Sequence, residues 1–122
     1  MEPKLYRWED MPRERLMEGL ERRFLHGEQA MIAHVYLKRG VIVPRHAHPN
    51  EQLTYVLEGA LRLVLGNDDG QVFDVRSGEV LVIPGGVPHS AEALEDTYDL
   101  DLFSPRREDW ISGNDAYLRG PR

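Results

Sequence analysis

The amino-acid sequence predicts an all-β domain with the architecture of a barrel or a sandwich. Short runs of strand-forming residues alternate with closely spaced turn residues, and the 122 residues are enough for one ordinary domain. The turn signals are Gly40, Pro49-Asn50, Gly59, 66–70 (GNDDG), Ser77-Gly78 and 84–88 (PGGVP). Many short strands at such spacing are typical of β-sandwiches and barrels.

The expected strands lie between these turns. In chain order they are 30–38 (AMIAHVYLK), 53–59 (LTYVLEG), 60–66 (ALRLVLG), 71–75 (QVFDV), 79–84 (EVLVIP) and 97–103 (TYDLDLF). The second and third are expected to join around Glu58-Gly59. The residues 67–70 (NDDG) predict a hairpin turn, because Asn, Asp and Gly tolerate positive φ.

The two ends differ from this middle. Residues 10–22 resemble a short helix interrupted by Gly19. Ser104 and Pro105 fit an N-cap and the first position of a helix that continues through 106–111. The remaining tail is polar and is expected to fray. We therefore expect one domain over 1–122, with an N-terminal arm at 1–20, a barrel at 21–104, and a short helix and tail at 105–122.

Composition excludes several classes of protein. The net charge of −6 and the dispersed basic residues argue against a nucleic-acid surface. The absence of cysteine excludes disulfides and thiolate metal sites. The polar first residues do not form a signal peptide, and no apolar window is long enough to cross a membrane. The sequence thus predicts a soluble, cytoplasmic protein with neither nucleic-acid nor membrane partners.

A set of metal ligands is predicted from the spacing of three histidines and a glutamine. His46, His48 and Gln52 share even parity, so they converge on one face if the strand stays regular between them, whereas Glu51 points away. His89 follows the turn at 84–88. Three imidazoles and one oxygen donor suit a divalent transition metal. The competing interpretation is a His-x-His pair on a solvated strand edge.

The same residues resemble the two motifs of the cupin family. Gly40, His46, His48, Gln52 and Gly59 have the spacing G-x5-H-x-H-x3-(E/Q)-x6-G. The second motif, G-x5-P-x-G-x2-H-x3-N, is matched by Gly78, Pro84, Gly86 and His89, with Ala93 at the usual asparagine. The resemblance implies a cupin double-stranded β-helix, or jelly-roll barrel, with short terminal extensions. It also implies one divalent metal held by His46, His48, Gln52 and His89.

Gln52 departs from the glutamate that is usual in cupins. A neutral ligand leaves the full charge on the metal, which favours Lewis-acid chemistry over redox chemistry. The metal itself stays open among Zn, Ni, Mn, Fe and Co. Two further functions also stay open, a metal-dependent dioxygenase and a non-catalytic sugar-binding cupin, because a fold does not fix a function.

The segment 97–110 carries a second group of candidate residues. Asp99, Asp101 and Phe103 share one strand face, and Tyr98, Leu100 and Leu102 share the other. If the leucines pack in the core, the aspartates face water. If the aspartates face the interior, Asp101 can transfer protons beside a metal, and Arg107 can bind a carboxylate.

A closer resemblance is to the small cupins of the KdgF type. It is carried by H-x-H-x2-E-Q-x2-Y-V-L-x-G, by P-x2-V-P-H-S-A and by D-x-F-S-P-x-R-x-D-W. These proteins convert 4,5-unsaturated uronate monosaccharides into open-chain keto acids. The resemblance implies an isomerase acting on a sugar acid, with Asp101 and Arg107 catalytic and with Phe103 and Arg107 binding the substrate. It also implies a homodimer that pairs through a sheet face and N-terminal strands.

Other polar residues carry weaker signals. His34 and Tyr36 share one face of the strand at 30–38 and are expected to be structural, with a pocket role as the alternative. Arg62 points either to the barrel mouth or to water. His26 is expected near a turn and exposed, and Glu51 either orients a ligand or pairs with a surface base.

Overall fold

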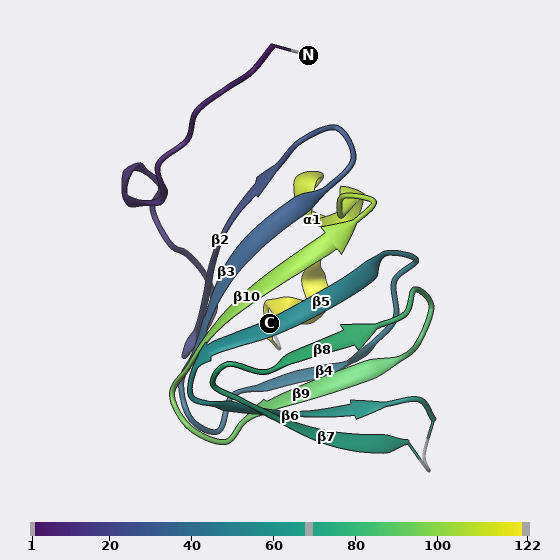
Figure 1. The fold of residues 1–122 in the computed structure, drawn as a ribbon. Coiled ribbons are helices and arrows are strands. Elements are labelled where there is room, and N and C mark those ends of the chain that lie inside the picture. Colours follow the sequence, from purple (N-terminus) through teal and green to yellow (C-terminus); the bar gives the residue numbers. More distant parts are fainter. Residues whose placement is uncertain (1, 68–69, 121–122) are drawn as a thin grey trace.

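The computed structural model describes residues 2–67 and 70–120. In this part of the chain, ten strands form two antiparallel sheets, one in the order β1-β2-β3-β10-β5-β8 and one in the order β4-β9-β6-β7 (Figure 1). The strands are β1 (Glu14–Met17), β2 (Leu20–His26), β3 (Met31–Leu37), β4 (Ile42–His46), β5 (Glu51–Glu58), β6 (Ala60–Leu65), β7 (Gln71–Arg76), β8 (Val80–Ile83), β9 (His89–Ala93) and β10 (Thr97–Ser104). The helical elements are η1 (Trp8–Asp10), α1 (Glu108–Ile111) and η2 (Ala116–Leu118). The prediction of an all-β barrel of the cupin type is confirmed.

Alternation along β3 and β10 places one face of each strand inside the barrel. In β3 the buried residues are Met31, Ala33, Val35 and Leu37. In β10 they are Thr97, Asp99, Asp101 and Phe103. The alternative in which the leucines of β10 occupy the core is therefore wrong. The barrel interior carries two carboxyl groups.

The chain crosses from one sheet to the other at Gly59. Its φ is +95°, and a Cβ there would lie 2.4 Å from the carbonyl oxygen of Asp96, so only glycine fits without strain. β5 and β6 join here as predicted, but they lie in different sheets. β6 then pairs with β7 from Ala60–Arg76 to Leu65–Gln71. The turn predicted at 67–70 includes positions 68 and 69, which lie outside the described residues.

The predicted N-terminal helix is wrong. Residues 14–26 form the hairpin of β1 and β2, and the chain reverses at Gly19, whose φ is +80°. The barrel therefore begins at Glu14 rather than at residue 21. Burial of Leu16 and Leu20 in the core outweighs the helical propensity of the surrounding charged residues.

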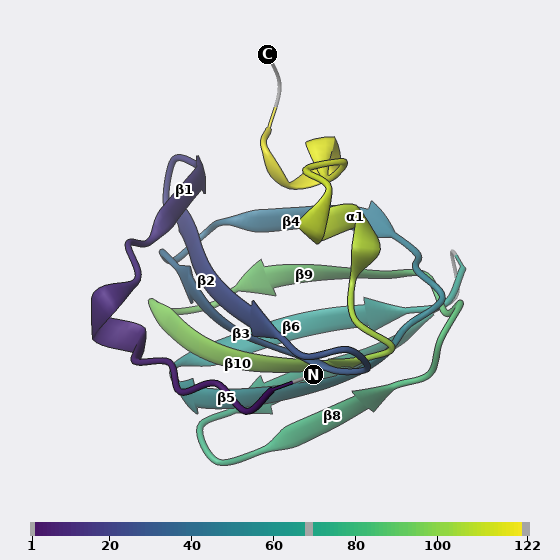
Figure 2. The same cartoon turned by 90° about the horizontal axis from the view of Figure 1, so that it is seen from above.

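The C-terminal segment also differs from its prediction. Ser104 ends β10 instead of capping a helix, and α1 begins only at Glu108, after Arg107. The tail is packed rather than frayed, because Asp115 and Leu118 are buried. Figure 2 shows this segment beside β4 and β1, the edge strands on one side of the two sheets. It thus covers an opening that two unpaired strand edges would otherwise border.

The outer face of the larger sheet exposes apolar side chains. Tyr55 and Val80 are opposite each other on β5 and β8, and Leu53 lies between Val82 and Leu102 in the register. Val80 and Val82 are 51% and 54% exposed. No helix in the described part of the chain has the length and hydropathy that a membrane span requires.

Candidate metal centre and adjoining cavity

Three histidines converge at one end of the barrel. His46 ends β4, His89 begins β9, and the two are paired in the strand register. One ring nitrogen from each of His46, His48 and His89 lies within 4.8 Å of the others. The alternation of side chains predicted that His46 and His48 converge from one regular strand, and the structure shows that they do not. β4 ends at His46, and His48 lies in the connection to β5.

Two loops fix the position of His48. The amide of Gly86 donates a hydrogen bond of 2.8 Å to the His48 carbonyl. A Cβ at Gly85 would lie 2.3 Å from the carbonyl oxygen of Pro49, so the two loops approach as closely as glycine permits. Asn50 donates from its side chain to the carbonyls of Pro105 and Arg106. The turn at 84–88 is therefore needed for the shape of the histidine cluster.

Backbone contacts select the tautomer of each histidine. The Nδ1 atoms of His46, His48 and His89 lie 2.8, 3.1 and 2.9 Å from the carbonyl oxygens of Pro44, Asn50 and Val87. A carbonyl only accepts, so each Nδ1 carries the proton and each Nε2 presents a lone pair. The Nε2 of His89 is buried and has no hydrogen-bond partner among the described residues. These three lone pairs form a donor set that suits a divalent transition metal.

Gln52 faces the same point from β5 in the other sheet. Its Nε2 donates to Thr54 Oγ1 at 2.9 Å and faces Asp101 Oδ1 at 3.4 Å, which leaves Oε1 directed at His48 Nε2, 3.0 Å away. Two lone-pair atoms facing each other repel unless a cation lies between them. With metal–ligand distances of about 2.0–2.2 Å, a separation near 3 Å is what two ligands of one ion show. The geometry therefore fits metal binding.

Electrostatics keep the histidines neutral. Burial lowers the pKa of His46 and of His48 to about 4 in each case. Burial also lowers the pKa of His89, and the positive charge of Arg107 acts in the same direction on all three. Metal ligands must be unprotonated, so the cluster is ready for a cation at neutral pH.

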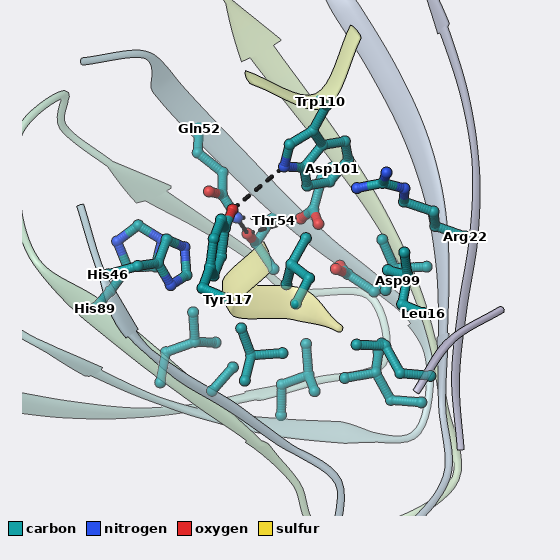
Figure 3. Close-up of a pocket in the computed structure, with 18 of the residues that line it drawn as sticks. Leu16, Arg22, His46, Gln52, Thr54, His89, Asp99, Asp101, Trp110 and Tyr117 are labelled. Atoms are coloured by element: carbon teal, nitrogen blue, oxygen red, sulfur yellow. Dashed lines mark hydrogen bonds between the residues drawn. The ribbon is translucent and has the colours of Figure 1, made fainter. Parts of the chain in front are cut away.

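Two carboxyl groups of β10 lie beside this cluster. Asp101 accepts hydrogen bonds from Thr54 at 2.9 Å and from Gln52 at 3.4 Å. Burial raises the pKa of Asp101, and burial together with the negative charge of Asp101 raises the pKa of Asp99 well above its ordinary value. Asp101 is thus joined through Gln52 to the candidate metal site (Figure 3).

Phe103 and Arg107 border the same cavity. The ring of Phe103 lies 5.8 Å from that of His48, and the Arg107 guanidinium lies 5.0 Å from the Phe103 ring. Arg107 is 1% exposed and donates through Nε and Nη2 to Asp109, and through Nη2 to the hydroxyl of Tyr117. The guanidinium fork is therefore already engaged by an internal carboxylate.

Arg22, Trp110 and Tyr117 also line the cavity, and the sequence alone did not identify them as site residues. The Tyr117 ring lies tilted against that of His46 with ring centroids 4.5 Å apart, and its hydroxyl accepts a hydrogen bond from Trp110 Nε1. Arg22 is buried and bonded to Asp115. Only the period-two pattern of β2 could have placed Arg22 inside. No sequence signal identified the tail residues.

The weaker candidates lie outside the cavity. His34 stacks on Trp8 at 4.1 Å and is 2.7 Å from the hydroxyl of Tyr98. Tyr36 accepts a hydrogen bond from Arg23. Arg62 forms a two-pronged ion pair with Asp74 on the surface. His26 and Glu51 are exposed.

The cavity itself measures about 70 Å³ and extends from the histidines into the barrel. Because one water molecule needs about 10–15 Å³ of such space, it has room for about five to seven waters. Its deep end is lined by apolar side chains such as Leu61 and Leu63, and its other walls carry the polar groups described above. A ligand the size of a small organic acid or a monosaccharide suits this space.

The fold and the histidine cluster together define a class of protein. Residues 33–104, more than half of the chain, match the cupin domain family, and the protein belongs to this family. Its chain is similar to the structure of KdgF from Halomonas sp., with 29% identity and a TM-score of 0.81 over 89% of this chain and 99% of that one.

Two other proteins share this likeness. An RmlC-like cupin from Shewanella frigidimarina NCIMB 400 is 27% identical, with a TM-score of 0.80 over 89% of this chain and 96% of that one. The oxalate decarboxylase OxdC of Bacillus subtilis is 36% identical over 62 residues, which span 49% of this chain and only 16% of OxdC.

Proposed function

We propose that the protein is a metal-dependent isomerase that opens the ring of 4,5-unsaturated uronate monosaccharides and ketonises the product. The observation that carries the proposal is the placement of Asp101, a buried carboxyl group hydrogen-bonded to Gln52 beside three histidines. The similarity to KdgF along nearly the whole chain supports the choice of substrate.

His46, His48, His89 and Gln52 would hold the divalent metal. When bound, the metal would supply Lewis-acid polarisation of the sugar oxygens. Gln52 contributes no charge, which favours this chemistry over oxidation. Its amide also fixes Asp101, because a single side chain faces His48 with its oxygen and Asp101 with its nitrogen.

Asp101 has the position and environment of a general acid–base. In its ionised form it accepts the C1 hydroxyl proton while the C1–O5 bond breaks, and the electron pair of that bond becomes the enolate at O5. The protonated carboxyl then delivers its proton to C4, the C4–C5 double bond supplies the electrons, and the enolate becomes a ketone. Atoms and charge balance with no oxidant or reductant. The raised pKa of Asp101, caused first by burial, suits a group that must hold a proton between these steps.

Phe103 and Arg107 shape the cavity around this chemistry. The Phe103 ring offers an apolar surface to the sugar ring. Arg107 is bonded to Asp109 and Tyr117, so its main contribution is a fixed positive charge near Asp101 and the histidines. That charge favours an anionic substrate.

The test is the loss of the ultraviolet absorbance of an unsaturated uronate on addition of protein and metal, with oxygen uptake recorded in parallel. We expect absorbance to fall without oxygen consumption, and we expect chelator-treated protein to be inactive. Oxygen uptake coupled to turnover would favour a dioxygenase. Binding of the sugar without any loss of absorbance would favour a non-catalytic cupin. Either result would contradict the proposal.

A further inference from the structure

A second arginine lies inside the barrel, at the end of the cavity away from the histidines. Arg22 belongs to β2, is 1% exposed and lines the same cavity as His46 and Asp101. Figure 3 shows the histidines and Arg22 on opposite sides, with Asp101 between them. A buried guanidinium is rarely found without partners, so its contacts indicate its role.

The protein fixes the orientation of Arg22 without any ligand. Its Nε donates to Glu14 Oε1 at 2.9 Å, and its Nη2 donates to Asp115. Its guanidinium lies 4.5 Å from the Trp110 ring and 5.1 Å from the Phe24 ring. β1 and the C-terminal segment therefore hold the group from two sides, and two aromatic rings restrict its plane.

One nitrogen of this guanidinium remains unused. Arg22 Nη1 is buried and has no hydrogen-bond partner within residues 2–67 and 70–120. Buried donors of this kind are uncommon, and each calls for an explanation such as a ligand. Arg107 is bonded through Nε and Nη2 to Asp109 and through Nη2 to Tyr117, so a carboxylate of the protein already occupies one side of its guanidinium.

We propose that Arg22 binds the carboxylate of the ligand and that the C-terminal segment, through Asp115 and Trp110, positions it to do so. The proposal deepens the proposed function, on which it rests for the identity of the acid. A carboxylate accepts hydrogen bonds from an arginine in a defined plane, which the two aromatic rings impose here. Arg22 would thus make the cavity selective for sugar acids over neutral sugars.

Several carboxyl groups lie near Arg22. Glu14 and Asp115 accept from its Nε and Nη2, and Nη1 remains for a ligand. Asp99 and Asp101 also line the cavity, and an ionised pair would repel a bound anion. Burial and the charge of Asp101 raise the pKa of Asp99 well above its ordinary value, which disfavours a negative charge on Asp99. The cavity wall therefore repels a bound carboxylate less than two freely ionised aspartates would.

The experiment compares binding of two unreactive probes, galacturonate and its methyl ester, by calorimetry on metal-loaded protein. The ester lacks the negative charge of the acid and carries one additional methyl group. We expect the parent to bind the acid at least about tenfold more tightly, about 1.4 kcal/mol. We expect Arg22→Gln to remove that preference. We expect Arg119→Gln, the matched control, to retain it, because Arg119 contacts the same Asp115 and Glu14 but does not line the cavity. Equal binding of acid and ester by the parent would overturn the inference.

A second variant controls for misfolding caused by the loss of Arg22. Arg22→Gln removes one of the two arginine partners of the buried Asp115. Arg22→Gln/Asp115→Asn restores the charge balance and should show the same loss of preference. Retention of the preference in both Arg22 variants, or its loss in Arg119→Gln as well, would overturn the assignment. Because the probes do not react, a parent that prefers the acid but leaves unsaturated uronates unchanged would refute the proposed function alone.

Discussion

Replacing Asp115 by asparagine should weaken the attachment of the C-terminal segment to the barrel. Asp115 is fully buried and bonds to Arg22, which is 1% exposed, and to Arg119 Nε at 3.0 Å. Burial alone would raise the pKa of Asp115, but the hydrogen bonds from Arg119 and Arg22 lower it below its ordinary value. Asparagine keeps the shape and removes the charge, so it isolates the electrostatic part of this anchor.

The expected cost follows from burial. Breaking a buried ion pair by removing one partner costs about 3–5 kcal/mol, and asparagine, which can still accept one hydrogen bond, should fall near 3 kcal/mol. A domain of this size has about 5–15 kcal/mol of stability, so the variant should fold. Its midpoint of thermal unfolding should fall by about 10 °C.

Urea unfolding at pH 7 measures this loss, and Glu14→Gln is the matched control. Glu14 contacts the same two arginines from a position 43% exposed, so its neutralisation should cost less than about 1 kcal/mol. The ionised Asp115 stabilises the fold above its unfolded pKa of 3.8, so the difference from the parent should shrink as pH falls below that value. If Asp115→Asn and Glu14→Gln cost the same free energy, the tail is not anchored as described.

Four other outcomes are expected. Asp101→Asn should keep metal and fold but lose about 10²–10⁴-fold in turnover, and parent-like activity would make Asp101 a structural residue. Arg107→Ala should raise KM more than it lowers kcat, and a change in kcat alone would refute the binding role. The variant should also be less stable, because Asp109 and Tyr117 lose the hydrogen bonds that Arg107 donates. In metal-free protein, a fall in pH from 6.5 towards 4 should destabilise the fold, because only the unfolded chain binds a proton at His48 in this range. This contribution to the free energy of unfolding, up to about 3 kcal/mol, should be absent in His48→Asn. The same pH dependence in the parent and the variant would contradict the burial of His48. Light scattering should give twice the mass of one chain, because the apolar outer face around Val80 and Val82 is suited to a homodimer; a monomer at micromolar concentration would exclude it.

The convergence of the candidate metal ligands could be predicted because they lie in two short segments with fixed spacing. His46, His48 and Gln52 fall within seven residues, and His89 follows a loop whose glycines are visible in the sequence. The period-two pattern of β10 predicted its two faces but not which of them lies inside the barrel. Both inferences rest on residues that are close together in the sequence.

The ends could not be predicted, because single long-range contacts determine them. Asp115 and Arg22 are 93 residues apart, and nothing local marks either as a partner of the other. The charged residues around Gly19 favour a helix locally, but pairing of β1 with β2 buries Leu16 and Leu20. Tertiary packing overrides local propensity at both places.

The central claim is that His46, His48, His89 and Gln52 bind one divalent transition metal at the mouth of the barrel. Elemental analysis of the purified protein, beside the triple variant His46→Ala/His48→Ala/His89→Ala, tests it most directly. We expect about one ion per chain in the parent and none in the variant, with the circular dichroism spectrum unchanged because the apolar core is independent of the site. Equal metal content in the two proteins would contradict the account.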